Sequence, residues 1–446
     1  MIQATLAQLY AEHLRELAQR TDRALATTGH DALIVYSGTP GLQFLDDAHY
    51  PFKVNPQFKA WLPLLDNPDC FLVHAPGSRP TLVFHQPQDY WYKPASTPKD
   101  FWVEHFELRV VHSLDAAREH LPRSLANAVV IGELPHEVRA WGFGHVNPRS
   151  FLDELDFDRA RKTPYELECM RRASAIAVQG HRAAARAFHA GESEYAAHMA
   201  YLQACGHREE EMPYNNIVAF NENGAVLHYQ HLERQAPPAA GRRSLLIDAG
   251  AQFHGYACDI TRTHAARDGD FKALVAAVDR VQQSLCAEVK PGLDYREFHL
   301  LAHRRLADVL REAGVIHVDA AAAVESGLSA VFFPHGLGHL LGLQVHDVGG
   351  YLRDKSGHTI EKPPGHPYLR LTRPLEQGFV VTVEPGVYFI DLLLAQARAN
   401  QHARHIDWGR VEEFRPYGGV RIEDDVAVTA SGHENLTRDA FARLAG

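Results

Sequence analysis

The chain has 446 residues, which is too long for one ordinary hydrophobic core and predicts two or three domains. A composition of 46% hydrophobic and 22% charged residues is typical of a globular protein, and the net charge of −10 argues against nucleic acids and anionic membrane surfaces as partners. No apolar run could span a bilayer, no signal peptide is evident, and the five cysteines form no CxxC pair, so we expect a cytoplasmic protein with reduced thiols.

The N-terminal part alternates predicted helices and strands, as in a compact α/β domain. Apolar residues recur at helical spacing over residues 3–28. Further elements are predicted in chain order: strands at 31–36, 70–73 and 81–84, a helix near 114–121, and a strand at 129–131. No cluster of His, Asp and Glu occurs here, so the chemistry is expected elsewhere.

A domain boundary is predicted near residues 159–164, because Pro164 suits the first turn of a new helix. The elements predicted after it are helices at 164–190 and 193–207, strands from 217 through 263, helices at 271–288 and 296–313, and strands at 379–389 and 419–428. Helices followed by strands thus occur twice, which suggests an internal duplication in the order of elements though not in sequence.

The segment 245–263 has two apolar runs around a glycine-containing turn, and this pattern predicts a β-hairpin. If the turn centres on Phe253 and His254, Asp248 and Asp259 lie directly opposite each other, with Cβ atoms about 4.5–5.5 Å apart. Two such carboxylates repel each other, and a dication between them removes that penalty. The hairpin therefore predicts either a metal site or two surface acids that end strands.

Three later segments add candidate ligands. His335 and His339 are four residues apart, but Gly336 replaces the glutamate of the zinc-protease helix motif, and nearby glycines favour a strand or loop over a helix. Glu384 ends a buried-looking strand, and Arg421 and Glu423 share a strand face. A carboxylate in a buried strand is costly unless it is paired or binds metal. The neighbouring acids at 424 and 425 are expected to be solvated or to end the strand.

The candidate ligands are therefore four carboxylates and one imidazole: Asp248, Asp259, His339, Glu384 and Glu423. Such a set suits Mn²⁺, Co²⁺ or Zn²⁺. Four carboxylates exceed what one ion needs, which indicates two ions with bridging carboxylates.

This ordered set resembles that of the dinuclear metallopeptidases with the pita-bread fold, among them methionine aminopeptidase, aminopeptidase P and prolidase. In the N-terminal half, residues 44–47, 50–61 and 89–91 resemble the bacterial Xaa-Pro dipeptidases. The resemblance implies a creatinase-like α/β domain over 1–160, which would mediate dimerisation and cover the pocket. It also implies an α+β pita-bread catalytic domain over 161–446, with a curved and mainly antiparallel sheet.

The resemblance implies hydrolysis of the bond before a C-terminal proline in Xaa-Pro dipeptides by a homodimer, with a side activity on organophosphate esters. Two divalent ions per subunit would be required, Mn²⁺ foremost and Zn²⁺ or Co²⁺ as alternatives. Asp248 would bind one ion, Asp259 and Glu423 would bridge, and His339 and Glu384 would complete the coordination of the second ion.

Further roles follow from the same resemblance. Glu384 would be the general base, and His335 and His346 would act beside it, with His346 stabilising the tetrahedral intermediate. The expected substrate-binding residues are His228 and Arg370 for the prolyl carboxylate, Arg421 as support for the ligands, and Tyr214, Trp91, Tyr295 and Asp47 as pocket residues, with Asp47 reaching the site of the partner subunit.

Three alternatives stay open. An enzyme of the aminopeptidase P type would release the N-terminal residue from longer Xaa-Pro peptides. A creatinase-like hydrolase would work without metal, and a non-catalytic binding module would only share the fold. The intact ligand set argues against the last two.

Overall fold

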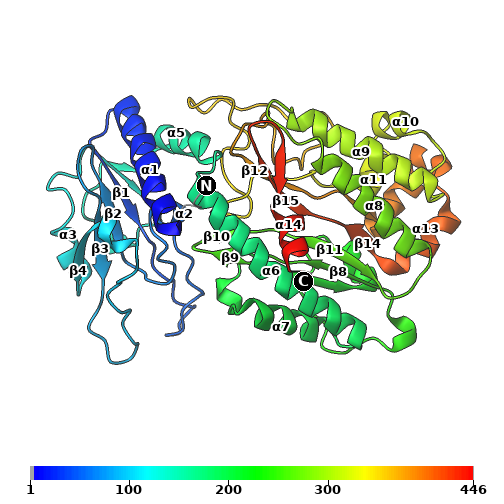
Figure 1. Cartoon of the computed structure of the whole chain (residues 1–446), viewed down its shortest axis with the longest axis horizontal. Coiled ribbons are helices and arrows are strands. Elements are labelled where there is room, and N and C mark those ends of the chain that lie inside the picture. Colours follow the sequence, from blue (N-terminus) through cyan, green and yellow to red (C-terminus); the bar gives the residue numbers. More distant parts are fainter. Residues whose placement is uncertain (1–4, 445–446) are drawn as a thin grey trace. The chain divides into compact units, whose positions relative to one another are not determined.

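The computed structural model describes residues 5–444, so the first two positions of the helix predicted at 3–28 lie outside the described part (Figure 1). The chain divides into two compact units. The N-terminal unit comprises residues up to Arg159 together with Thr163–Glu168 and Asp354–His358. The C-terminal unit comprises Ala160–Lys162, Cys169–Arg353 and the residues from Thr359 onward.

The N-terminal unit is built on a six-stranded mixed sheet with strand order β4-β3-β2-β1-β5-β6. Its central strand β1 is buried at every position and pairs antiparallel with β2 and parallel with β5. The strands are β1 (Ala32–Tyr36), β2 (Phe71–His74), β3 (Thr81–His85), β4 (Glu107–Val111), β5 (Ala128–Ile131) and β6 (His145–Val146). The helices are α1 (Leu6–Thr28), α2 (Pro56–Trp61), α3 (Leu114–Arg118), α4 (His136–Arg139) and α5 (Arg149–Arg159). The α/β character predicted for this part is confirmed.

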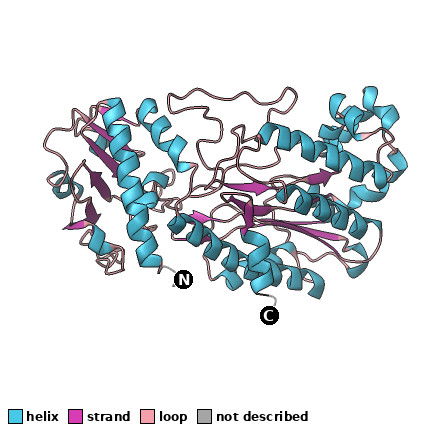
Figure 2. Ribbon diagram, turned by 45° about the horizontal axis from the view of Figure 1, so that its top comes forward, coloured by secondary structure: helices cyan, strands magenta, loops and turns pink. Residues whose placement is uncertain are grey.

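The C-terminal unit contains antiparallel strands with helices around them (Figure 2). The strands are β7 (Ile217–Phe220), β8 (Ser244–Asp248), β9 (Gln252–Phe253), β10 (Tyr256–Ala257), β11 (Thr261–Ala265), β12 (Val380–Val383), β13 (Gly386–Tyr388), β14 (Gly419–Arg421), β15 (Asp424–Val428) and β16 (His433–Asn435). The helices are α6 (Pro164–Ala190), α7 (Glu194–Cys205), α8 (Asp270–Cys286), α9 (Tyr295–Glu312), α10 (Ala320–Glu325), α11 (Ser329–Phe332), α12 (Asp391–Arg398), α13 (Trp408–Phe414) and α14 (Leu436–Arg443).

Two halves of this unit repeat the order of helices and strands that the sequence indicates. Apolar side chains of α6 and α7 share a core with β7 and β8, whereas those of α8 and α9 share a core with β12 and β15. A bridge between Thr261 and Glu423 joins the strands of the two halves. The candidate ligands fall on the strand ends that meet at this junction.

The register of the hairpin differs from the prediction. Asp248 lies opposite Thr261, not opposite Asp259. The turn is one residue later than expected, because His254 and Gly255 have φ angles of 51° and 84° and positive φ at both central residues is what a type I′ turn requires. The pairing therefore shifts by two residues, and the two aspartates become diagonal neighbours on one face.

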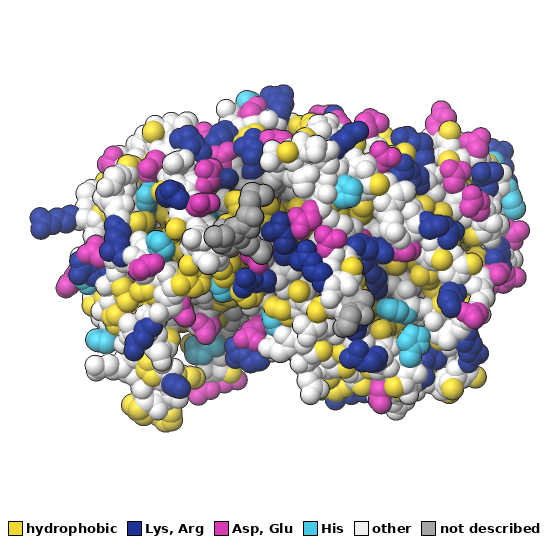
Figure 3. Space-filling view, viewed as in Figure 1, with side chains coloured by type: hydrophobic (Ala, Val, Ile, Leu, Met, Phe, Trp, Pro, Cys, Tyr) yellow, Lys and Arg dark blue, Asp and Glu magenta, His cyan; other side chains and the backbone are white. Residues whose placement is uncertain are grey.

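None of the helices in residues 5–444 combines the length and apolar character needed to cross a bilayer. On the molecular face in Figure 3, basic and acidic side chains are interspersed.

Candidate active site

A cavity of about 530 Å³ in the C-terminal unit collects most of the predicted site residues. The predicted residues that line it are His228, Asp248, Asp259, His335, His339, His346, Arg370, Glu384, Arg421 and Glu423. The sequence did not indicate Tyr351, Lys362 and Tyr368, which line the same cavity. Residues from distant segments thus converge on one site.

The acids are placed by strand ends. Asp248 is the last residue of β8, Glu384 follows β12, and Glu423 lies between β14 and β15. The glycine-rich segment that carries His339 runs antiparallel to β12, since the Thr382 amide donates to the His339 carbonyl at 3.0 Å. Gly338 is required there, because a Cβ would lie 2.1 Å from the Thr382 carbonyl oxygen. The segment is extended, as the sequence predicted.

The five candidate ligands form one cluster. Possible ligand atoms of Asp259, His339 and Glu423 all lie within 4.8 Å of one another. His339 Nε2 lies 3.5 Å from Asp259 Oδ2 and 3.6 Å from Glu384 Oε1. Its Nδ1 lies 3.0 Å from the Leu340 carbonyl, which only an N–H can satisfy, so Nε2 carries the lone pair toward the carboxylates.

Charge in the cluster is strongly unbalanced. Four buried or half-buried carboxylates face one buried guanidinium, that of Arg421, which donates to Asp248 Oδ2 at 2.5 Å. Burial raises the pKa of Glu384 to about 7, and burial together with the charge of Asp259 holds the pKa of Glu423 well above its usual range. Excess buried negative charge of this kind is what divalent cations neutralise, so the donor set fits such ions.

Hydroxyl groups orient the acids. The Tyr214 hydroxyl lies 2.8 Å from Asp248 Oδ1 and 2.5 Å from Asp259 Oδ1, and with one proton it donates to one of them at a time. Thr261 Oγ1 donates to Glu423 Oε2 at 2.5 Å. Tyr214 is therefore close to the predicted site, but it contacts the acids and does not line the cavity.

A chain of hydrogen bonds supports His335. Arg421 Nη1 donates to the Tyr388 hydroxyl at 2.9 Å, and that hydroxyl lies 2.8 Å from His335 Nε2. His335 Nδ1 lies 2.8 Å from the Gly336 carbonyl, so both ring nitrogens are engaged. Burial lowers the pKa of His335 to about 3, which keeps the ring neutral. Tyr388 was not recognised in the sequence, where it resembles any strand aromatic.

His228 is held in place by a buried carboxylate in α7. Glu194 accepts hydrogen bonds from the Phe220 amide at 2.7 Å and the Tyr229 hydroxyl at 2.7 Å, and from Asn223 Nδ2 and the Glu233 amide. All of these donors belong to the segment that carries His228 into the cavity. Hydrogen bonds to a charged acceptor are strong, so the segment is well fixed.

Four of the predicted pocket residues are absent from the lining of this cavity: Tyr214, described above, and Tyr295, Trp91 and Asp47. Tyr295 is fully buried and donates to the Thr382 carbonyl at 2.7 Å, so it supports β12 and does not line the pocket, contrary to our expectation. Trp91, with 78% of its surface exposed, and Asp47 belong to the N-terminal unit. Their contribution to the site stays a prediction.

Asp424 and Asp425 are not solvated, contrary to one of our two expectations, since both are fully buried. The other expectation, a place at the end of a strand, holds for Asp424, which is the first residue of β15. Asp424 accepts from Arg262 Nη2 at 2.7 Å and Arg438 Nε at 2.8 Å. Burial alone would raise the pKa of Asp424, but these guanidinium groups hold it at about 2. Asp425 accepts from the Asp259 amide at 3.1 Å, so it positions a candidate ligand.

Comparisons with known proteins agree with this geometry. Residues 168–430 match metallopeptidase family M24, and residues 8–157 match the N-terminal domain of Xaa-Pro dipeptidases. The Xaa-Pro dipeptidase of Xanthomonas axonopodis pv. citri (strain 306) is 51% identical over 99% of this chain and 100% of its own length. That of Stenotrophomonas maltophilia (strain K279a) is 51% identical over 100% of both.

Among solved structures, aminopeptidase P from E. coli with the inhibitor Pro-Leu matches with a TM-score of 0.72 and 24% identity, over 96% of this chain and 95% of that one. At this identity the match concerns the fold. The predicted fold class, an α/β domain followed by an α+β pita-bread domain, is confirmed.

Proposed function

The chain belongs to metallopeptidase family M24 and, within it, to the Xaa-Pro dipeptidases, and we propose on this premise that it hydrolyses the peptide bond before the C-terminal proline of Xaa-Pro dipeptides. The observation that carries the proposal is the convergence of a complete carboxylate and imidazole set on one cavity. Identity of about half of all residues along the whole chain supports the substrate class.

The catalysis requires divalent metal ions, and we propose two of them. Asp248 would hold one ion, Asp259 and Glu423 would be shared, and His339 and Glu384 would complete the other set. A set dominated by carboxylates favours Mn²⁺, with Zn²⁺ and Co²⁺ as alternatives. Bound ions supply Lewis acidity toward the scissile carbonyl and the attacking water.

The side chains of the cavity supply the proton transfers. Glu384 takes the proton of the attacking water and returns it to the prolyl nitrogen, a secondary amine that departs only when protonated. Thr382 Oγ1 lies 3.4 Å from Glu384 Oε1 and orients the carboxylate. His346, whose ring packs 4.5 Å from that of His339, stabilises the developing oxyanion. His335, with both nitrogens engaged, shapes the wall of the cavity.

The free carboxylate of the substrate needs a cation, and Arg370 suits it better than Lys362, whose Nζ donates to the Pro367 carbonyl at 2.6 Å. Arg421 is already committed to Asp248, Tyr388 and Thr261, so it supports ligands and does not meet substrate. Arg370, which is exposed on the loop before β12, lines the cavity, and so does His228 from the other half of the C-terminal unit. We assign the carboxylate contact to these two residues.

Replacing Arg370 by alanine is expected to raise KM for Gly-Pro about 10–100-fold, because a charge-assisted hydrogen bond contributes about 1.5–3 kcal/mol. The Mn²⁺ content should stay at the wild-type level, since Arg370 contacts no candidate ligand. Steady-state kinetics and metal analysis on the same preparation check both points. An unchanged KM would remove Arg370 from the substrate site.

Substrate length separates the proposal from its alternative. With Mn²⁺, we expect turnover of Ala-Pro and little turnover of Ala-Pro-Ala or Ala-Ala, because the C-terminal carboxylate must meet Arg370. An enzyme of the aminopeptidase P type would cleave Ala-Pro-Ala and leave Ala-Pro intact. Full activity after exhaustive chelation would instead favour the metal-free hydrolase.

We also propose a cytoplasmic homodimer assembled through the N-terminal unit, in which Asp47 and Trp91 reach a substrate pocket. The five cysteines are all free thiols, which supports a reducing compartment. Hydrolysis of organophosphate esters is proposed as a side activity, since tetrahedral phosphorus resembles the intermediate of peptide hydrolysis.

A further inference from the structure

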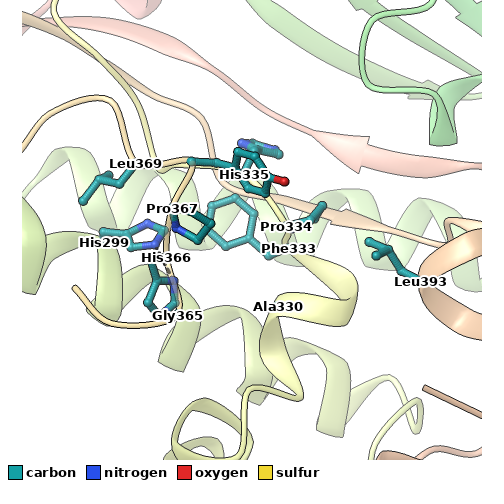
Figure 4. Close-up of a pocket in the computed structure, with 11 residues that line it drawn as sticks. His299, Ala330, Phe333, Pro334, His335, Gly365, His366, Pro367, Leu369 and Leu393 are labelled. Carbon is teal, nitrogen blue, oxygen red and sulfur yellow. Dashed lines mark hydrogen bonds between the residues drawn. The ribbon is translucent and has the colours of Figure 1, made fainter. Parts of the chain in front are cut away.

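A second cavity, of about 190 Å³, lies beside the first in the C-terminal unit (Figure 4). The two cavities share Pro334, His335, Pro367, Tyr368 and Leu393 in their walls. The second one is distinguished by imidazoles without carboxylates, because His299 and His366 line it, no Asp or Glu among the described residues does, and His303 packs against both. No role in the proposed hydrolysis uses these three histidines.

The three rings form a compact cluster. His299 and His303 are four residues apart on α9, a spacing that places side chains on one helix face. His366 comes from the proline-rich loop, and the three ring centroids are each 4.6 Å from the other two. One ring nitrogen from each residue lies within 4.8 Å of the others. Such spacing is compatible with a single ion held by all three.

One nitrogen in the cluster has no partner. His303 is 1% exposed, and its Nδ1 lies 2.9 Å from Ser329 Oγ, but its Nε2 is buried without a hydrogen bond. Buried polar atoms are nearly always satisfied, so this unpaired imidazole nitrogen next to two other imidazoles is available to bind a ligand. Burial lowers the pKa of His303 to about 3, which keeps the ring in the neutral form that binds metals.

We propose that His299, His303 and His366 bind one late first-row transition-metal ion such as Zn²⁺, at a site separate from the carboxylate cluster. A set of imidazoles without carboxylates suits Zn²⁺, Cu²⁺, Ni²⁺ or Co²⁺, whereas the neighbouring carboxylate set suits Mn²⁺. Three imidazoles leave a fourth position for water from the cavity. The chain thus holds two classes of metal ion at two sites, one made of imidazoles and the other mainly of carboxylates.

The hydrogen bonds of His299 fix its tautomer. The Leu337 amide donates to His299 Nδ1 at 3.2 Å, so the ring proton sits on Nε2 and faces His366 Nδ1 at 2.9 Å. An ion bound to His299 Nε2 requires that proton to move to Nδ1, and the Leu337 hydrogen bond is then given up.

The test compares metal content in the full-length, Mn²⁺-loaded protein. His366→Ala is the first variant, because His366 lies on a partly exposed loop, and His303→Gln is the second. His317→Gln, at an exposed histidine after α9, is the matched control. Each protein is equilibrated with Zn²⁺, passed through a desalting column and analysed for zinc and manganese per chain.

We expect wild type and His317→Gln to retain one more zinc per chain than His366→Ala and His303→Gln. The manganese retained before zinc is added should be equal in all four proteins. Equal zinc in all four would overturn the proposal. If His303→Gln does not fold, the loop variant His366→Ala decides alone. Zinc that replaces manganese at the carboxylates would appear equally in every protein and so does not affect the difference.

Discussion

Replacing Glu384 by glutamine is expected to reduce kcat for Ala-Pro by about 10²–10⁴-fold, the usual contribution of a general acid–base group. Glutamine keeps the shape of the side chain but can neither take the proton of the attacking water nor return it to the prolyl nitrogen. It also removes one anionic oxygen 3.6 Å from His339 Nε2, so metal affinity should fall as well. The measurement is kcat at saturating Mn²⁺, where weaker metal binding no longer limits the rate.

The control is Glu325→Gln, at an exposed glutamate that ends α10. It should leave both kcat and metal content at the wild-type level. If Glu384→Gln regains wild-type kcat once Mn²⁺ is saturating, the carboxylate acts as a ligand alone. The proton would then have to pass through another group, and His346 would be the first to examine because it lines the same cavity.

Three of the candidate ligands could be predicted from the sequence because each of them violates a local rule. Asp248 and Glu384 end apolar runs, and Glu423 interrupts one, so each acid demands a partner whatever the fold is. The order of helices and strands could also be predicted, because the apolar residues of α6, α8 and α9 recur at regular helical spacing. The free-energy cost of burying an unpaired acid and the spacing of apolar residues can both be read from a single sequence.

The register of the hairpin could not be predicted in the same way. A turn on Phe253 and His254 would set Asp259 opposite Asp248, whereas the chain turns on His254 and Gly255. The positive φ of His254 is rare for a residue with a side chain, and glycine had to supply the second such position. A shift of one residue in the turn moves the pairing by two, which keeps both acids on one face.

Tertiary partners account for the other differences. Asp424 looks like a solvated strand-end acid until Arg262 and Arg438, from distant segments, are placed beside it. Tyr295 looks like a pocket aromatic, but its hydroxyl donates a hydrogen bond to the carbonyl of Thr382 in β12. The partners of a polar side chain depend on packing between segments, and no pattern within one segment reveals them.

The two aspartates of the hairpin are expected to respond differently to substitution. Asp259→Asn should strip both proposed ions, because Asp259 lies in the cluster with His339 and Glu423 and is the acid we assign to both ions. Asp248→Asn should chiefly empty one of them, because Asp248 is turned toward Arg421. Manganese per chain after dialysis against a limiting Mn²⁺ concentration measures this difference, and equal losses in both variants would contradict the bridging role of Asp259.

Thermal unfolding of the metal-free proteins separates loss of metal from loss of folding. Burial alone would raise the pKa of Asp259, but the contacts with His339 and Tyr214 hold it below its usual value, so the ionised form stabilises the fold and Asp259→Asn should lower the melting temperature. Asp248→Asn takes the 2.5 Å ion-pair partner from Arg421, which is only 4% exposed, and breaking a buried pair costs up to about 3–5 kcal/mol. Both variants should therefore melt lower than wild type, with Asp248→Asn at least as low as Asp259→Asn, while Asp248→Asn retains more manganese. If Asp259→Asn were the lower of the two in both measurements, loss of folding would explain the metal loss, and the distinct roles of the two acids would be refuted.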